Sequence, residues 1–152
     1  MDLQIERAEI LSAESRQLMA ELWAEIDLLY GNEIATAAEF HGTGADEIVF
    51  VVARLKGNAV GCGAIRPRHA SIAEVKRVFV RPAARRSGVA RAIMHALEQL
   101  ARERDFSALW LETGLRQPGA LALYESLGYT RIAAFGDYKD DPLSVCLGKR
   151  LK

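Results

Sequence analysis

Cysteine is scarce in this sequence, and long apolar runs are missing from it. The two cysteines among its 152 residues, Cys62 and Cys146, fit no metal-ligand spacing and are too few for a disulfide framework. We therefore expect two reduced thiols in the core. No apolar run approaches the roughly 18 residues that a membrane span needs. The N-terminus has neither the basic start nor the apolar stretch of a signal peptide, which makes a cytoplasmic protein without a membrane partner the default expectation.

The chain also lacks net charge, but its charges are unevenly distributed. Residues 1–50 hold eleven acidic and two basic residues, whereas residues 51–152 hold nine acidic and eighteen basic ones. Such a chain can present one face to an anion and another to a cation. A nucleic-acid binder would carry a basic pI and aromatic residues among its basic ones. The pI here is about 6.8 and no aromatics interleave the basic run, so we expect no nucleic-acid partner.

The length and the order of the expected elements predict one domain over residues 1–152. Hydrophobic periodicity and turn residues place strands at residues 3–8, 48–55, 59–66, 71–80, 107–113, 129–135 and 142–151. They place helices at residues 13–30, within 32–46, at 89–104 and at 118–127. Helices interleaved with strands predict an α/β or α+β fold with mixed strand directions.

A cationic loop precedes the helix expected at 89–104. Pro82 ends the strand before it, and Gly88 lets backbone approach a ligand closely. The first turn of a helix carries unpaired N–H groups and a partial positive charge, yet its neighbours here are Arg85, Arg86 and Arg91. Cations at that end oppose helix stability unless an anion binds there, and phosphate is the usual guest. The loop therefore predicts a phosphate-binding site.

Two motifs resemble one known family. Arg85-Arg86-Ser87-Gly88-Val89-Ala90 matches the R/Q-x-x-G-x-G/A motif of the GCN5-related N-acetyltransferase (GNAT) superfamily, with alanine in place of the commoner last glycine. The preceding "EVKRVFVRP" resembles the family's fourth strand, and "LALYESLGY" resembles its A-x-x-L-Y-x-x-x-G-F/Y segment. The resemblance covers Glu74 to Tyr129. It implies a single acetyltransferase domain with a GNAT-like mixed, mostly antiparallel central sheet of about seven strands flanked by about four helices.

The resemblance also implies acetyl-CoA as a cosubstrate, without a metal. In this family the loop amides bind the pyrophosphate, and the end of the fourth strand pairs with the pantetheine arm. By position, the residues that would pair with the arm are Val78, Phe79 and Val80. The pyrophosphate falls to Arg85, Arg86, Ser87, Gly88, Val89, Ala90 and Arg91. Gln117, followed by Pro118, stands where many relatives carry an asparagine that touches the cofactor.

The chemistry implied is direct transfer of an acetyl group to a primary amine. The amine must lose a proton before it attacks, and the thiolate that leaves gains from a proton donor. The resemblance implies Tyr124 as that donor. Glu74 and Glu112 are the candidate bases, because a carboxylate on a central strand can have a raised pKa through partial burial. The alternative for each glutamate is a charge paired with an arginine.

The acceptor stays open at this stage. Acidic residues of the first segment and of the region near Asp137 would attract a cationic amine. A free amino acid, a polyamine, an aminoglycoside and a peptide N-terminus all fit that description, and the sequence leaves a homodimer open. The alternative function is a non-catalytic acyl-CoA-binding or sensor module on the same fold. The presence of Tyr124 favours the enzyme.

Overall fold

The computed structural model describes residues 2–30 and 48–152, and within them it contains seven strands and three α-helices. The strands are β1 (Leu3–Ala8), β2 (Val49–Leu55), β3 (Asn58–His69), β4 (Ile72–Val80), β5 (Ala108–Gly114), β6 (Thr130–Arg131) and β7 (Ser144–Arg150). The helices are α1 (Ala13–Tyr30), α2 (Val89–Glu103) and α3 (Pro118–Ser126), with short 3₁₀ turns η4 (Pro82–Ala84) and η5 (Gly136–Asp140). The predicted order of strands and helices is confirmed for these residues. The additional helix expected within 32–46 lies outside the described residues.

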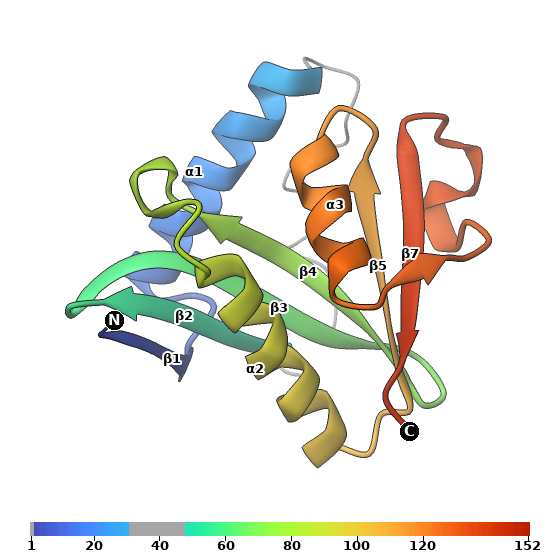
Figure 1. The fold of residues 1–152 in the computed structure, drawn as a ribbon, viewed down its shortest axis with the longest axis horizontal. Coiled ribbons are helices and arrows are strands. Elements are labelled where there is room, and N and C mark those ends of the chain that lie inside the picture. The colour runs from blue at the N-terminus through green and yellow to red at the C-terminus, as the bar shows by residue number, and fades with distance from the viewer. Residues whose placement is uncertain (1, 31–47) are drawn as a thin grey trace.

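The strands form one mixed sheet in the order β1-β2-β3-β4-β5-β7-β6. Every neighbouring pair is antiparallel except β4 and β5, which run parallel. The parallel pairing joins only Ile72 to Ala108, Ala73 to Leu109 and Glu74 to Trp110. Beyond Glu74 the two strands separate, and Figure 1 shows β4 and β5 diverging towards α1 and α3. The sheet is therefore split along its middle.

A β-bulge in β4 accompanies the split. Lys76 pairs with Ala64 and Phe79 pairs with Cys62, so Arg77 and Val78 both oppose Gly63. Arg77 has a left-handed φ of 64°, as an extra residue in a strand often requires. Bulges bend a strand and re-aim its side chains, and they are common next to active sites.

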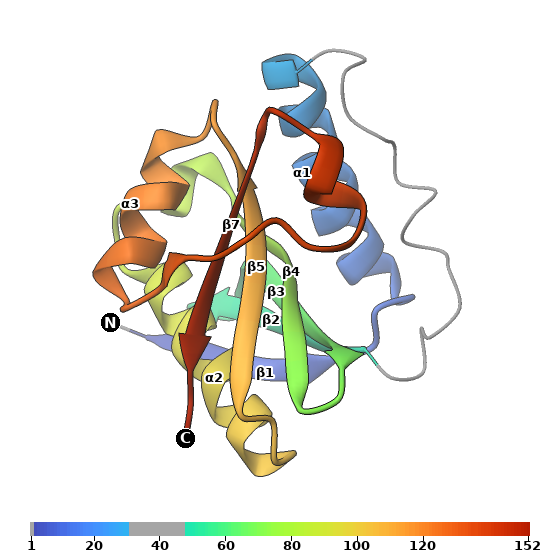
Figure 2. The same ribbon diagram turned by 90° about the vertical axis from the view of Figure 1, so that its right-hand side faces the viewer.

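The helices cover the two faces of the sheet, as the two views in Figures 1 and 2 show. On one face α2 and α3 pack over the larger core, in which Ile93, Met94 and Leu97 of α2 are fully buried. On the other face Leu18 of α1 belongs to a smaller core that includes Phe50 and Phe79. Ser12 caps the N-terminus of α1, since its hydroxyl oxygen accepts a hydrogen bond from the Ser15 N–H at 3.1 Å. Truncating a buried residue such as Ile93 to alanine would cost about 2–5 kcal/mol of stability.

The strand expected over 129–135 is the main correction. Only Thr130 and Arg131 form β6, although the Ile132 N–H still reaches the Cys146 carbonyl at 3.0 Å. Phe135 instead packs against Trp110, at 5.1 Å between ring centroids, and Gly136 with φ 56° turns the chain into η5. Side-chain packing thus overrides the strand pattern there. Both cysteines are buried and free, as expected. None of the described helices is long and apolar enough to cross a membrane.

Candidate active site

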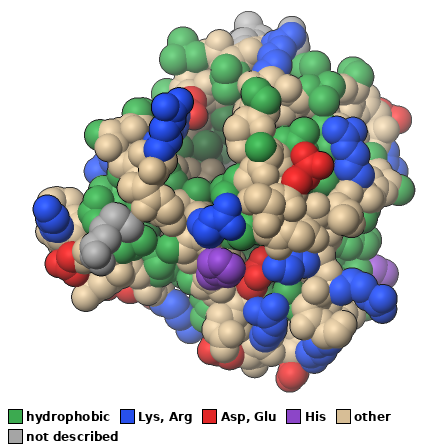
Figure 3. Space-filling model, in the orientation of Figure 1, with side chains coloured by type: hydrophobic (Ala, Val, Ile, Leu, Met, Phe, Trp, Pro, Cys, Tyr) green, Lys and Arg blue, Asp and Glu red, His purple; other side chains and the backbone are tan. Residues whose placement is uncertain are grey.

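A pocket opens where β4 and β5 separate. In the space-filling view of Figure 3 it is the hollow between α1 and α3. Residues of four segments line it: Leu22, Trp23, Ile26 and Tyr30 of α1; Glu74 to Val78 of β4; Leu111 to Gly114 of β5; and Gln117, Ala120 and Tyr124 around α3. Asp137, Tyr138, Asp141 and Leu143 close it from the η5 side. The pocket therefore joins the predicted catalytic residues to the predicted cofactor strand.

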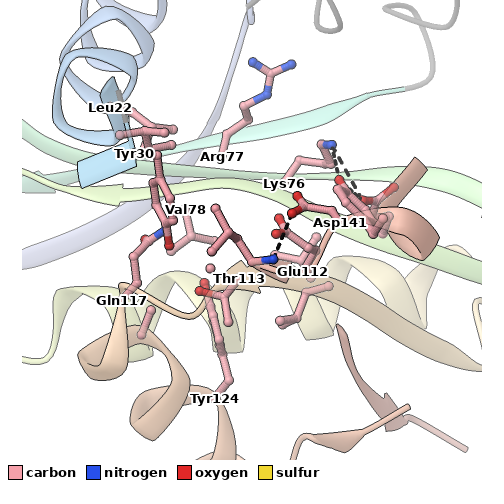
Figure 4. A pocket seen from close by; sticks show the side chains of 18 of the residues that line it. Leu22, Tyr30, Lys76, Arg77, Val78, Glu112, Thr113, Gln117, Tyr124 and Asp141 are labelled. Carbon is pink, nitrogen blue, oxygen red and sulfur yellow. Dashed lines mark hydrogen bonds and ion pairs between the residues drawn. The ribbon is translucent and has the colours of Figure 1, made fainter. Parts of the chain in front are cut away.

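Tyr124 enters the pocket from α3. It is 8% exposed and packs edge-to-face on Tyr129, with 6.1 Å between ring centroids. Figure 4 shows its side chain pointing from α3 towards Thr113. Burial, and then the charge of Glu112, raise the pKa of the Tyr124 phenol well above its usual range. The phenol is thus held in its protonated, proton-donating form.

Glu112 reaches the same pocket from β5 and is joined to the η5 segment by a serine. The Ser144 hydroxyl lies 2.7 Å from a Glu112 carboxylate oxygen and 2.8 Å from an Asp141 carboxylate oxygen. Burial is the main cause that raises the pKa of Glu112, and the charges of Asp141 and Glu74 raise it further. The Ser144 hydrogen bond and Lys76 act in the opposite direction. Because Ser144 has one hydroxyl proton, it donates to one of the two carboxylates at a time or shares the proton between them.

Glu74 also lies in the pocket wall, but cations surround it. Its side chain is 1% exposed, and one carboxylate oxygen lies 3.3 Å from Arg66 and 3.4 Å from Arg68. The other oxygen accepts a hydrogen bond from the Tyr138 hydroxyl at 3.1 Å and lies 3.6 Å from Lys76. The paired arrangement named above as the alternative is therefore present at Glu74. It is less available to a substrate than Glu112.

The predicted phosphate loop has the backbone of a ligand cradle. Gly88 is the N-cap residue of α2 with φ 85°, and Arg86 is left-handed with φ 64°. A Cβ built on Gly88 would meet no protein atom within 4 Å, so the space above it is open. The Ser87 hydroxyl donates back to the Ala84 carbonyl, and Val89 is buried beneath the loop beside Ala90. The loop therefore presents backbone, with the first turn of α2, to an anion.

Two arginines at or near this loop pair with acidic residues of α1. Arg81 makes a bidentate pair with Glu21, with both N···O distances at 2.9 Å. Arg85 pairs with Glu25 and also donates to the Val80 carbonyl at 2.8 Å. These contacts fasten the acidic first helix to the end of β4 and neutralise part of its charge. Arg91 donates to Ser126 of α3 at 2.9 Å.

The side chains of the strand residues predicted to bind the pantetheine arm pack in the two cores. Phe79 is 4% exposed in the core under α1, and Val78 and Val80 face the core under α2. Their backbone, together with the half-buried Val78 side chain that lines the pocket, is left to contact a ligand. On the side of β5 no described residue of β4 beyond Glu74 has a strand partner, so that edge can pair with an extended arm. Gln117, the N-cap residue of α3, lines the pocket opposite. These features fit the pantetheine arm of acetyl-CoA.

Tyr138 and Ser144 were missed by the sequence interpretation. Tyr138 of η5 lines the pocket and Ser144 contacts Glu112, and no periodicity predicts η5. Asp141 also lines the pocket and belongs to the acidic region that was expected to attract an amine.

Tyr30, the last residue of α1, lines the pocket, accepts a hydrogen bond from the Arg116 N–H at 3.0 Å and packs on Gly114. A Cβ at position 114 would lie 1.6 Å from the Tyr30 hydroxyl, so Gly114 is the one sequence signal for this close approach.

The split mixed sheet, the glycine loop at the start of α2 and the tyrosine of α3 define an N-acetyltransferase. The chain belongs to the Acetyltransferase (GNAT) family, whose sequence model matches residues 11–129. It is 39% identical over 136 residues to an IAA acetyltransferase of Azospirillum brasilense, covering 89% of each chain. It is similar in structure to a putative acyl-CoA N-acyltransferase from Klebsiella pneumoniae, with a TM-score of 0.84, 34% identity and coverage of 99% and 98%.

A more distant structure shares the fold. It is the PaiA N-acetyltransferase of Thermoplasma acidophilum in complex with coenzyme A, with a TM-score of 0.73, 14% identity and 99% coverage of both chains. The expected family and fold are confirmed by these comparisons.

Proposed function

We propose that this protein transfers the acetyl group of acetyl-CoA directly to a primary amine of a small molecule or peptide. The observation that carries the proposal is the meeting of Tyr124 and Glu112 in one pocket at the split between β4 and β5. A proton donor and a proton acceptor in one pocket suit a reaction in which one proton is lost and another gained. A module that only binds acyl-CoA has no need of this pair.

Acetyl-CoA would be held by backbone more than by side chains. The free edge of β4 at Val78, Phe79 and Val80 would pair with the pantetheine arm, and the loop from Arg85 to Arg91 would take the pyrophosphate. Gln117 would add a side-chain amide. Arg86 makes no ion pair with another residue that the structure describes, whereas Arg85 is paired with Glu25. We therefore assign the phosphate contacts chiefly to the amides around Gly88 and the first turn of α2.

Tyr124 would act as the general acid. The amine nitrogen attacks the thioester carbonyl, a C–N bond forms, and the C–S bond breaks to release a thiolate. The thiolate takes the phenolic proton of Tyr124. A raised phenol pKa keeps that proton in place at neutral pH until the thiolate develops.

Glu112 would act as the base, and we favour it over Glu74. Glu74 is enclosed by Arg66, Arg68 and Tyr138. Among the described residues, the Glu112 carboxylate accepts a side-chain hydrogen bond from a serine alone. A raised pKa brings Glu112 closer to neutrality, where a base works best. Ser144 and Asp141 continue from Glu112 towards the η5 surface, so the amine proton would leave along them.

The experiment is a thiol-release assay with acetyl-CoA against a panel of amines, run on the parent and on Glu112→Gln. Turnover with an amine, strongly reduced in Glu112→Gln, supports the proposal. Glu74→Gln is the comparison that separates the two glutamates, because it should lose folding stability rather than show a changed pH profile. If CoA stabilises the protein but no amine accelerates thiol release, the acyl-CoA sensor is the better description.

A further inference from the structure

The half of α1 that lines the pocket is not held by a buried core. It contributes Leu22, Trp23 and Ile26 to the pocket wall, and Figure 4 shows Leu22 and Tyr30 at the pocket. Within this helix no residue between Leu18 and Tyr30 is buried, and Leu22 packs only partly buried against the smaller core. A segment with few buried apolar contacts opens at a low cost in free energy. Other contacts must therefore keep it in place.

Two ion pairs lie on this half of the helix. Glu21 makes the bidentate pair with Arg81, and Glu25, one helical turn later, pairs with Arg85. Each glutamate directly precedes a pocket-lining residue of α1. The hydrogen bonds from Arg81 lower the pKa of Glu21, so this carboxylate is charged at neutral pH. The pocket half of α1 is thus fastened at two points.

Both arginines are also fixed to the sheet. Arg81 Nη1 donates to the Ala59 carbonyl oxygen at 2.8 Å, and the Arg81 backbone N–H donates to the Val60 carbonyl oxygen at 2.7 Å. Arg85 Nε donates to the Val80 carbonyl oxygen at 2.8 Å. An arginine that is already oriented loses less freedom when it binds a carboxylate. These two pairs therefore define one position of α1 relative to β3 and β4.

From these contacts we propose that Glu21 and Glu25 are positioning residues for the acceptor amine. Through Arg81 and Arg85 they hold the pocket half of α1 against the sheet, and so they determine how tightly the acceptor binds. They take no part in bond making. Their role in acceptor binding rests on the proposed acetyl transfer, whereas their hold on α1 does not.

The first turn of α1 provides a matched control. Glu14 pairs with Arg54 through both of its carboxylate oxygens, as Glu21 does with Arg81. Its side chain is 43% exposed and that of Glu21 is 32% exposed. None of the described residues that precede Leu22 lines the pocket. Glu14→Gln therefore removes a similar pair from the same helix, outside the pocket half.

Amide hydrogen exchange measures the hold on α1 without any substrate. In Glu21→Gln/Glu25→Gln the amides of residues 22–29 should exchange faster than in the parent. Each pair contributes up to about fivefold, so the double variant should show up to about 25-fold faster exchange. Glu14→Gln should leave the exchange of residues 22–29 at the parental rate. Unchanged exchange of these residues in the double variant overturns the proposal.

Steady-state kinetics measure the consequence for the acceptor. The assay is thiol release at saturating acetyl-CoA, with the amine of the panel that gives the highest turnover. In Glu21→Gln we expect KM for the amine to rise about 2- to 5-fold, with kcat and the Kd of CoA close to parental. The groups proposed to move protons lie on α3 and β5, so loosening α1 leaves them in place. Glu14→Gln should show the parental KM.

Arg81→Gln separates positioning from direct attraction of a cationic amine. If Glu21 acts by holding α1, loss of either partner loosens the helix, and both single variants raise KM. If Glu21 instead attracts an ammonium ion, Arg81→Gln frees its charge and lowers KM. Under positioning, Glu21→Gln/Arg81→Gln should add little to either single change, because all three variants lose the same interaction.

The outcomes distinguish this proposal from the proposed function. A lower KM in Arg81→Gln, or a parental KM in Glu21→Gln/Glu25→Gln, overturns the positioning role and leaves acetyl transfer standing. If no amine accelerates thiol release while CoA still binds, acetyl transfer and the acceptor role both fail, and hydrogen exchange alone decides whether the pairs hold α1.

Discussion

Replacing Gly88 with valine tests whether the loop before α2 binds CoA. Gly88 has φ 85°, and the chain offers a matched control in Gly57, which has φ 84° in the turn between β2 and β3. A Cβ at either glycine meets nothing within 4 Å. Both substitutions therefore impose the same left-handed strain, about 2 kcal/mol, without a clash. For a chain of this length each should lower Tm by about 4–8 °C.

The two variants should differ only in their response to CoA. A ligand present at 100 times its Kd stabilises the native state by about 2.7 kcal/mol, which raises Tm by roughly 5–11 °C. The parent and Gly57→Val should both show that rise. In Gly88→Val the side chain fills the space above the loop, and loss of one charge-assisted hydrogen bond weakens CoA by about 10- to 100-fold. Between about half and nearly all of the rise should then disappear.

Thermal melts with and without CoA, followed by titration calorimetry, measure both effects. Desulfo-CoA should act like CoA, because the loop contacts the pyrophosphate and not the sulfur. If Gly88→Val keeps the same CoA-induced rise as Gly57→Val, the phosphates bind elsewhere and the reasoning about this loop is wrong.

Three further predictions concern the catalytic groups. Tyr124→Phe should lower kcat by about 100- to 10,000-fold, or less if water replaces the phenol, with CoA affinity nearly intact; an unchanged kcat would make Tyr124 a packing residue. Ser144→Ala removes a hydrogen bond that lowers the pKa of Glu112, so the acidic limb of the kcat–pH profile, measured at saturating substrates, should move to higher pH. Ser71→Ala, just before the start of β4, is the control and should leave that limb in place. Burial raises the pKa of Glu112 in the folded protein, so its charged form is unfavourable there and folding stability is lost as pH rises through that pKa. Glu112→Gln should therefore have a higher Tm than the parent at alkaline pH and the same Tm at acid pH. A melting difference that grows on acidification would contradict the last prediction.

Much of the site could be predicted from local sequence because its parts are continuous segments. Pro82 and Gly88 bracket a strand-to-helix turn, and the apolar spacing of the following residues fixes the face of α2 that packs on the sheet. Tyr124 was assigned differently, through the resemblance of its segment to the family motif. Backbone chemistry and helical periodicity act over a few residues, so these features are legible without the fold.

The bulge in β4 can be predicted in part from the sequence. Val75, Val78 and Val80 all face the core under α2, which strict alternation forbids between Val75 and Val78. That three-residue step signals the extra residue at Arg77. It does not tell how far β4 then diverges from β5, because the divergence depends on strands that are distant in the sequence.

Long-range partners were decided by the tertiary structure alone. Arg85 reads as a phosphate ligand in its loop, yet Glu25 of α1 lies close enough to pair with it. Glu74 and Glu112 are equivalent as glutamates on neighbouring strands. Only the fold surrounds the first with arginines and joins the second to Ser144. The sequence by itself determined which chemical groups this protein has and on which elements they lie. Packing between segments far apart in the chain set the charge environment of these groups, because electrostatic interactions depend on distance in space and on burial. That environment decides which of the groups can accept or donate a proton.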